Sequence, residues 1–291
     1  ACDVGTNSCR LLVAEVIDKR LQIIFKKVVT TRIGQGVGQS GWLHPAAIAR
    51  TVDCLGKFSE EMFHRQITDA MVVCTSAVRE AFNREDFLVL AEERIGHRIE
   101  VLSGEEEGYY SYLGAKKALR MKRNPLVVDV GGGSTEFVMR QRRNHALSLP
   151  IGAVRATEGG WDKAKVMGEL AQGFKPDWVK PEVPLALVGG TATTLVAMKK
   201  KMRKYDPEKV QGEVLTLNDI ENLYQKVVSL SVEERKSLPG LQPERADIID
   251  QGILIVKSII EYLERDHVVV SDSDLLDGII WTLHEKHVLS K

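Results

Sequence analysis

The sequence has no long apolar run and no excess of charge of either sign. No stretch approaches the roughly 18 consecutive apolar residues that indicate a membrane-spanning helix, and no signal-peptide pattern is visible. The 40 basic and 40 acidic residues give a formal net charge of +0. This balance argues against a broad nucleic-acid-binding surface and a polybasic membrane segment. We therefore expect a cytoplasmic protein that binds neither nucleic acids nor membranes.

Cysteines and aromatic residues are also scarce. The four cysteines form no C-x-x-C pair, so we expect reduced thiols in an apolar core instead of a disulfide framework or a zinc site. The seven histidines show no metal-ligand spacing. Aromatic residues make up 6% of the chain and do not alternate with basic ones, which argues against a stacking platform for single strands.

One polar hairpin pattern occurs twice, 126 positions apart. The segment DVGTNSCRLLV at 3–13 aligns without a gap on DVGGGSTEFVM at 129–139. Each reads as a strand that ends in an aspartate, a turn of small residues and a second strand. Backbone N–H groups of glycine-rich turns converge on anions. Two such hairpins facing each other would clamp a chain of phosphates.

The order of predicted elements also repeats. In the first half, the strand that ends at Asp3 and strands at 11–17, 21–31, 70–75 and 99–102 accompany helices at 45–66, 86–95 and 104–119. In the second half, strands at 126–130, 135–140, 146–149, 185–188 and 268–271 accompany helices at 161–174, 191–202, 218–230, 244–263 and 273–287. Apart from extra helices, both halves read βββαβαβα. The sequence predicts an α/β protein with two such domains, residues 1–120 and 121–291, flanking a cleft. The last helix could pack back on the first domain.

Residues of the two hairpins are candidates for binding phosphate and a cation. The phosphate cradle comprises Gly5, Thr6, Asn7 and Ser8 in one turn and Gly131, Gly132, Gly133, Ser134 and Thr135 in the other. Magnesium keeps several waters and takes one or two carboxylates together with phosphate oxygens. Asp3, Asp129 and Glu136 are the candidate ligands. Glu136 follows Asp129 by seven positions, across the turn, whereas Arg10 occupies the equivalent position after Asp3 and could pair with phosphate.

A catalytic base is expected among Glu105, Glu106 and Glu107. Ser103-x-x-Glu106 has the form of a capping box, in which Glu106 bonds back to the backbone N–H of Ser103. That gives Glu106 a structural role and leaves Glu105 and Glu107 as candidates. A simple acidic first turn, favoured by the helix dipole, is the structural alternative.

Further cationic and glycine-rich positions complete the candidates. Arg79 follows a buried strand, and its guanidinium could pair two phosphate oxygens or form a surface ion pair with Glu80 or Glu85. Arg155 is a weaker candidate of the same kind. The turn at 189–191 could hold distal phosphates through Gly190 and Thr191 at a helix N-terminus, or simply connect two elements. The basic run at 199–204 reads first as cations at a helix C-terminus, and second as an accessory polyanion site.

The duplicated hairpin and its topology resemble the actin-like, ribonuclease H-like superfamily. TSAVREA at 75–81, LSGEEEG at 102–108, VDVGGGSTEF at 128–137, VGGTAT at 188–193 and LLDG at 275–278 occur in this order. Together they resemble the exopolyphosphatase / guanosine pentaphosphate phosphatase (Ppx/GppA) family, in its short two-domain form. The resemblance covers essentially the whole chain. We also expect a few residues upstream, because only Ala1 and Cys2 precede Asp3 and a strand averages about five residues.

The resemblance implies an enzyme that hydrolyses phosphoric anhydrides, with Mg²⁺ or Mn²⁺ as cofactor. The fifth residue of S-G-x-E-E in that family activates water, and this is Glu107 here; Gly108 departs from the alanine that usually follows. The implied substrate is inorganic polyphosphate. The alternatives are guanosine pentaphosphate hydrolysis, an alarmone-binding regulator of guanosine penta- or tetraphosphate, and an actin-like kinase or ATPase. The oligomeric state stays open, a homodimer included.

Overall fold

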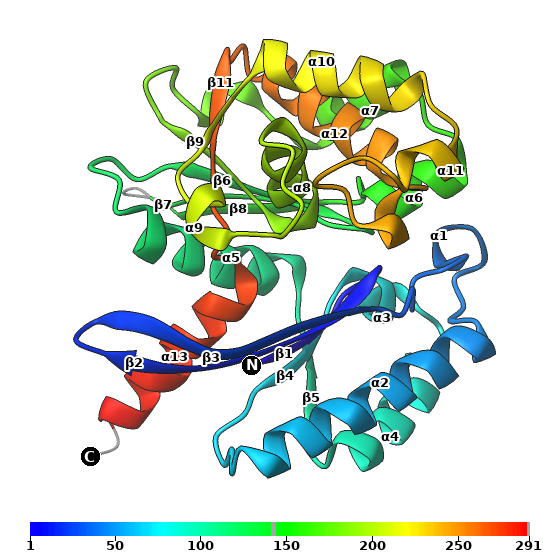
Figure 1. Ribbon diagram of the computed structural model, residues 1–291, viewed down its shortest axis with the longest axis vertical. Helices are drawn as coiled ribbons and strands as arrows, with labels where there is room; N and C mark the ends of the chain where they lie inside the picture. The colour runs from blue at the N-terminus through cyan, green and yellow to red at the C-terminus, as the bar shows by residue number, and fades with distance from the viewer. Residues whose placement is uncertain (141–143, 290–291) are drawn as a thin grey trace. The chain divides into compact units, whose positions relative to one another are not determined.

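The computed structural model describes residues 1–140 and 144–289 (Figure 1). The chain divides into two compact units, one of residues 1–114 and 275–291 and one of residues 115–274. Within the described ranges no helix is long and apolar enough to cross a membrane.

The first unit is built on a five-stranded sheet in the order β3-β2-β1-β4-β5. Its strands are β1 (Cys2–Val4), β2 (Ser8–Ile17), β3 (Arg20–Thr30), β4 (Val72–Cys74) and β5 (Ile99–Val101). β1 pairs antiparallel with β2 and parallel with β4, and β4 pairs parallel with β5. Its helices are α1 (Val37–Ser40), α2 (Pro45–His64), α3 (Ser76–Glu80), α4 (Arg84–Ile95), α5 (Gly104–Leu119) and α13 (Leu275–Leu289); the residues of α5 from Ala115 belong to the second unit.

Both faces of this sheet are covered along its central strands, because the buried first part of β2 carries apolar side chains at successive positions. Leu11 and Val13 pack into a cluster with α2 and α4, whereas Leu12 packs into a second cluster with α13. Figure 1 shows α2 and α4 stacked together beside the cyan strands, with α13 in red beside the long β2–β3 hairpin. A sheet buried on both faces places its polar residues at strand ends, where the hairpin turn lies.

The second unit repeats this arrangement in a six-stranded sheet, β10-β11-β9-β6-β7-β8. Its strands are β6 (Leu126–Val130), β7 (Thr135–Arg140), β8 (Asn144–Leu149), β9 (Leu185–Val188), β10 (Val214–Thr216) and β11 (His267–Val270). Its helices are α6 (Ala153–Gly159), α7 (Lys163–Gly173), η1 (Pro176–Trp178), α8 (Gly189–Lys199), α9 (Pro207–Val210), α10 (Leu217–Val228), α11 (Val232–Arg235), η2 (Pro243–Arg245) and α12 (Ile249–Tyr262).

The two sheets share one strand order. If β6, β7, β8, β9 and β11 are numbered 1 to 5 as the counterparts of β1 to β5, both sheets have the strand order 3-2-1-4-5. β10 is an added antiparallel edge strand. The predicted duplication of an actin-like α/β unit is therefore confirmed. β10 and the short helices α1, α3, α6, α9 and α11 were not predicted, because elements of three to seven residues show no measurable periodicity.

Candidate active site

The two hairpin turns close in the same way. In the first unit, the N–H of Gly5 donates to the carbonyl oxygen of Ser8 at 3.1 Å, and in the second, the N–H of Gly131 donates to that of Ser134 at 3.0 Å. A Cβ atom on either glycine would lie 3.1 Å from the same acceptor oxygen. The duplicated sequence thus folds into a duplicated turn, and a side chain at either glycine would crowd the carbonyl oxygen that closes it.

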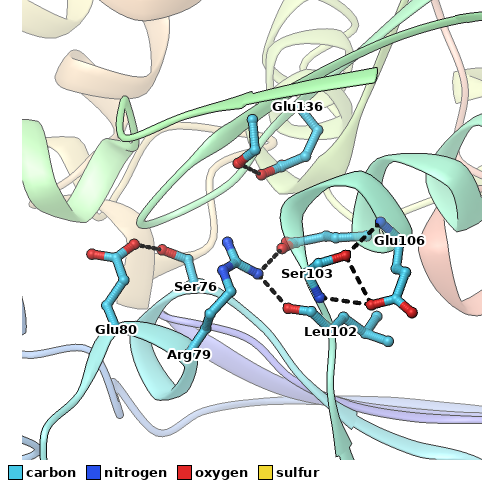
Figure 2. Close-up of polar contacts among 9 residues, drawn as sticks. Ser76, Arg79, Glu80, Leu102, Ser103, Glu106 and Glu136 are labelled. Carbon is cyan, nitrogen blue, oxygen red and sulfur yellow. Dashed lines mark hydrogen bonds and ion pairs between the residues drawn. The ribbon is translucent and has the colours of Figure 1, made fainter. Parts of the chain in front are cut away.

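The second hairpin brings two carboxylates together. Asp129 at the end of β6 lies directly opposite Glu136 in the strand register, so the two side chains share one sheet face. The hydroxyl of Ser148 on β8 donates to Oε1 of Glu136 at 2.8 Å, and Glu136 is only 1% exposed (Figure 2). The seven-residue spacing therefore places both carboxylates on one side of the turn, as the sequence indicated.

Gly189 leaves room for the Asp129 carboxylate. It has a φ of +90°, and a Cβ atom there would lie 2.6 Å from Oδ1 of Asp129. The end of β9 and the start of α8 therefore approach the end of β6 closely. Beside it, Gly190 lies under the guanidinium of Arg245, whose two terminal nitrogens would each be 2.3 Å from an added Cβ. Arg245 had no signal in the sequence, because it lies two residues after Pro243 in a segment that reads as an ordinary helix.

The first hairpin carries an ion pair in the equivalent place. Asp3 lies opposite Arg10 in the register, and the Nε of Arg10 donates to Oδ2 of Asp3 at 2.8 Å. Its terminal nitrogen lies 2.7 Å from the same oxygen, and Asp3 is buried. The two hairpins thus differ in charge: one holds two acids, and the other an acid and a guanidinium. Arg10 is oriented by Asp3.

Arg79 and Glu107 form another ion pair of the first unit. A terminal nitrogen of Arg79, on α3, lies 3.0 Å from Oε2 of Glu107 and donates to the carbonyl oxygen of Leu102 at 2.7 Å (Figure 2). Glu107, in the first turn of α5, is 8% exposed. Neither of the surface partners considered for Arg79 takes this role: Glu80 accepts from Ser76, and Glu85 pairs with Arg84.

The three glutamates at the start of α5 have different surroundings. The capping box is confirmed: Oε2 of Glu106 accepts from the N–H and the hydroxyl of Ser103, both at 2.8 Å, and the Glu106 N–H donates to that hydroxyl at 3.2 Å (Figure 2). Glu105 is exposed, whereas Glu107 is buried. Of the three, Glu107 is the carboxylate that the helix start holds inside the unit.

The remaining candidates lie in the second unit. Nε of Arg155 donates to the carbonyl oxygen of Gly133 at 2.8 Å, so this arginine braces the turn. Thr191, in the first turn of α8, is buried beside Gly252 of α12. Thr135 donates its hydroxyl to the carbonyl oxygen of Ile151 at 2.6 Å. These contacts fix the shape of the turn that follows β6.

The two carboxylates of the second hairpin suit a hard divalent cation that keeps several of its water ligands. Asp129 and Glu136 offer carboxylate oxygens from paired positions of β6 and β7. Mg²⁺ commonly takes one or two carboxylates of the protein beside phosphate. Over residues 1–140 and 144–289, no group of three or more histidine, cysteine, aspartate or glutamate side chains is arranged to hold a metal ion. Any such ion would depend on water and substrate for its other ligands.

Comparisons with known proteins cover almost the whole chain. The sequence profile described as the Ppx/GppA phosphatase family matches residues 12–287. The bifunctional 3-dehydroquinate synthase/phosphatase of Fusobacterium nucleatum is 34% identical over 96% of this chain, which spans 45% of that relative's length. Exopolyphosphatase 2 of Mycobacterium tuberculosis is 32% identical over 97% of each chain.

A solved structure extends the comparison to three dimensions. The crystal structure of the Aquifex aeolicus member of the Ppx/GppA family has a TM-score of 0.81 and 32% identity, covering 98% of this chain and 97% of that one. The sequence profile, the relatives and this structure agree along the length of the chain. The protein therefore belongs to the Ppx/GppA phosphatase family.

Proposed function

We propose that the protein is an exopolyphosphatase that removes terminal phosphates from inorganic polyphosphate by attack of water. The observation that carries the proposal is the ion pair between the buried Glu107, at the start of α5, and the half-buried Arg79. A carboxylate held inside a unit, next to a guanidinium, can take a proton from water while the guanidinium pairs with phosphate oxygens. The exopolyphosphatase relative supports the choice of substrate.

The residues take separate roles in this reaction. Glu107 accepts the proton of the attacking water. Arg79 donates a hydrogen bond to that carboxylate, and its positive charge attracts the terminal phosphate. The backbone N–H groups of 5–8 and 131–135 bind phosphate oxygens, with Arg10 and the 190–191 turn beside them. Asp3, Asp129 and Glu136 would hold a Mg²⁺ or Mn²⁺ ion. When bound, that ion would offset the charge that develops on phosphate oxygens.

A side-by-side assay tests the substrate. Phosphate release would be measured from tripolyphosphate, long polyphosphate, guanosine pentaphosphate and ATP, with and without Mg²⁺. We expect the largest kcat/KM for polyphosphate, measured per chain end. A preference for guanosine pentaphosphate would instead assign the second activity that the family includes. Binding of guanosine tetraphosphate without turnover of any substrate would indicate a regulator, and a preference for ATP an actin-like ATPase.

A further inference from the structure

The start of α6 holds the second hairpin turn by its carbonyl oxygens. The N–H of Ala153 donates to the carbonyl oxygen of Gly131 at 3.0 Å. The N–H groups of Val154 and Arg155 donate to that of Gly132 at 2.9 and 3.1 Å. Three backbone N–H groups at the beginning of one helix therefore fix two consecutive carbonyl oxygens of the turn.

Arg155 holds the next carbonyl oxygen with its side chain. Its Nε donates to the carbonyl oxygen of Gly133 at 2.8 Å. The helix start and the turn approach each other so closely that a Cβ atom on Gly152 would lie 2.3 Å from the carbonyl oxygen of Gly132. Arg155 and the start of α6 therefore act together on one side of the turn.

These contacts set the direction of the N–H groups of the turn. Its peptide bonds are trans, and the C=O and N–H of one trans peptide plane point in opposite directions. Because the carbonyl oxygens at 131–133 are bonded to α6, the N–H groups of Gly132, Gly133 and Ser134 point away from that helix. The N–H of Ser134 shares its peptide plane with the carbonyl that Arg155 holds, so Arg155 fixes its direction.

The first hairpin holds the equivalent carbonyl oxygen with backbone donors. Asn7 occupies the position that aligns with Gly133. Its carbonyl oxygen accepts from the N–H groups of Thr31 and Arg32 at 3.2 and 2.9 Å. In the second hairpin the side chain of Arg155 takes the place of these two donors. The carbonyl has a donor in both repeats, which favours a positioning role for Arg155 over direct pairing with phosphate.

We propose that Arg155 is a positioning residue of the phosphate site, which holds the Gly133 carbonyl oxygen so that the N–H of Ser134 faces phosphate oxygens. This role rests on the proposed binding of phosphate chains by the turn at 131–135. Backbone N–H groups that converge from successive residues bind an anion, whereas a carbonyl oxygen turned toward the anion would repel it. The contribution of Arg155 is thus the hydrogen bond from Nε, and its charge is not required.

Two replacements of Arg155 separate the hydrogen bond from the charge. Nε2 of glutamine is the fourth side-chain atom, as Nε of arginine is, so Arg155→Gln keeps a donor for the Gly133 carbonyl oxygen and loses the charge. Arg155→Met has the same number of side-chain atoms up to that point and loses both. Binding of bismethylene triphosphate, an analogue of tripolyphosphate without hydrolysable P–O–P bridges, would be measured by calorimetry.

We expect Arg155→Met to raise the Kd of the analogue on the order of tenfold, because one carbonyl of the turn loses its partner. Arg155→Gln should stay within about threefold of the unmodified protein, since its hydrogen bond remains. Equal losses in the two variants would show that Arg155 contacts phosphate through its charge and would overturn the proposal. An unchanged Kd in Arg155→Met would overturn it too.

The salt dependence of binding is a second measurement, and it needs only Arg155→Gln. Removing a direct contact between a cation and phosphate lowers the slope of log Kd against log salt by about one. We expect this variant and the unmodified protein to give parallel lines between about 50 and 200 mM salt. A smaller slope in Arg155→Gln would overturn the proposal, even if Arg155→Met fails to fold.

The same experiment separates this proposal from the proposed activity. Binding of the analogue without hydrolysis of tripolyphosphate would contradict the enzyme activity and leave the comparison of the two variants valid. No binding of the analogue by the unmodified protein would overturn both.

Discussion

At the residue scale, the proposed base is Glu107, and its removal gives the sharpest prediction. Glu107→Gln keeps the size of the side chain and its contact with Arg79 but cannot accept the proton of water. We expect phosphate release to fall by about 10²–10⁴-fold, the usual cost of losing a general base. Binding of polyphosphate, measured by calorimetry with the same variant, should stay near that of the unmodified protein.

Glu106→Gln and Glu105→Gln are the matched controls for this change. Glutamine can replace glutamate in a capping box, so Glu106→Gln should keep the start of α5 intact. Glu105 is exposed, so its replacement should change little. Turnover of Glu107→Gln equal to the unmodified protein would reject the assignment. An equally large loss in Glu106→Gln, with an intact fold, would transfer the role to that residue.

Replacing Gly189 should affect both the stability of the protein and its Mg²⁺ requirement. Gly189→Ala places a methyl group 2.6 Å from Oδ1 of Asp129 and puts a side chain on a backbone with φ of +90°. We expect a loss of about 1–3 kcal/mol in the free energy of unfolding and a higher Mg²⁺ concentration for half-maximal activity. Denaturant unfolding and a Mg²⁺ titration check the two effects.

Gly168→Ala is the control for Gly189→Ala. Gly168 lies within α7, and an added Cβ there meets no atom within 4 Å. Alanine at such a helical position should stabilise the protein by about 0.4–1 kcal/mol, because it restricts the unfolded chain. Unchanged stability and unchanged Mg²⁺ dependence in Gly189→Ala would mean that β9 can move away from Asp129 at little cost.

The sequence predicted residue contacts where they are local. The Asp129–Glu136 pair and the Ser103–Glu106 capping box span seven and three positions, and strand and helix geometry alone brings their members together. The Arg79–Glu107 ion pair joins residues 28 positions apart, and only the packing of α3 beside the start of α5 creates it. The site roles themselves stay predictions.

At the element scale, the β6–β7 hairpin is expected to hold the cation. Asp129→Asn and Glu136→Gln each remove one charged oxygen ligand from adjacent positions of the hairpin. We expect both variants to require more Mg²⁺ for half-maximal phosphate release, measured by titration from micromolar to millimolar Mg²⁺. The neutral replacements keep the shape of the side chains, so the strand register should survive.

Asp162→Asn is the control for the cation titration. Asp162 caps α7 through the N–H of Lys165, and asparagine is an equally good cap. This variant loses one negative charge from the same unit without touching the hairpin, so its Mg²⁺ requirement should not change. If Asp129→Asn and Glu136→Gln also keep the original requirement, the ion is held elsewhere, with Asp3 as the next candidate.

Elements were predictable where their pattern was long. The helices at 45–64 and 104–119 and the strands at 126–130 and 135–140 carry clear periodicity or clear turn signals, and they were found within about two residues of their predicted ends. The edge strand β10 has only three residues, and its pairing with β11 joins segments about 50 positions apart. Nothing in its own sequence separates it from a loop.

At the scale of the whole molecule, charge balance predicts the response to polyphosphate length. The formal net charge is +0, and two members of the basic run at 199–204 are already engaged. Lys199 bonds to Glu213 and Asp219, and Lys200 bonds to Glu213. Although partial burial works against it, these hydrogen bonds raise the pKa of Lys199. Lys199 and Lys200 therefore serve their own unit, which leaves Lys201, Arg203 and Lys204 of the run for a long polyanion.

Affinity for polyphosphate should accordingly rise over the first few phosphates and then level off. Few ion contacts would be released by salt, so binding should weaken only modestly between about 50 and 200 mM salt. Measuring kcat/KM per chain end for tripolyphosphate, chains of about ten and chains of several hundred phosphates checks this, because a clamp of few contacts saturates early. Lys201→Gln tests the run without breaking the ion pairs of Lys199 and Lys200. A continuing gain for the longest chains that disappears in Lys201→Gln would show that the basic run extends the binding track.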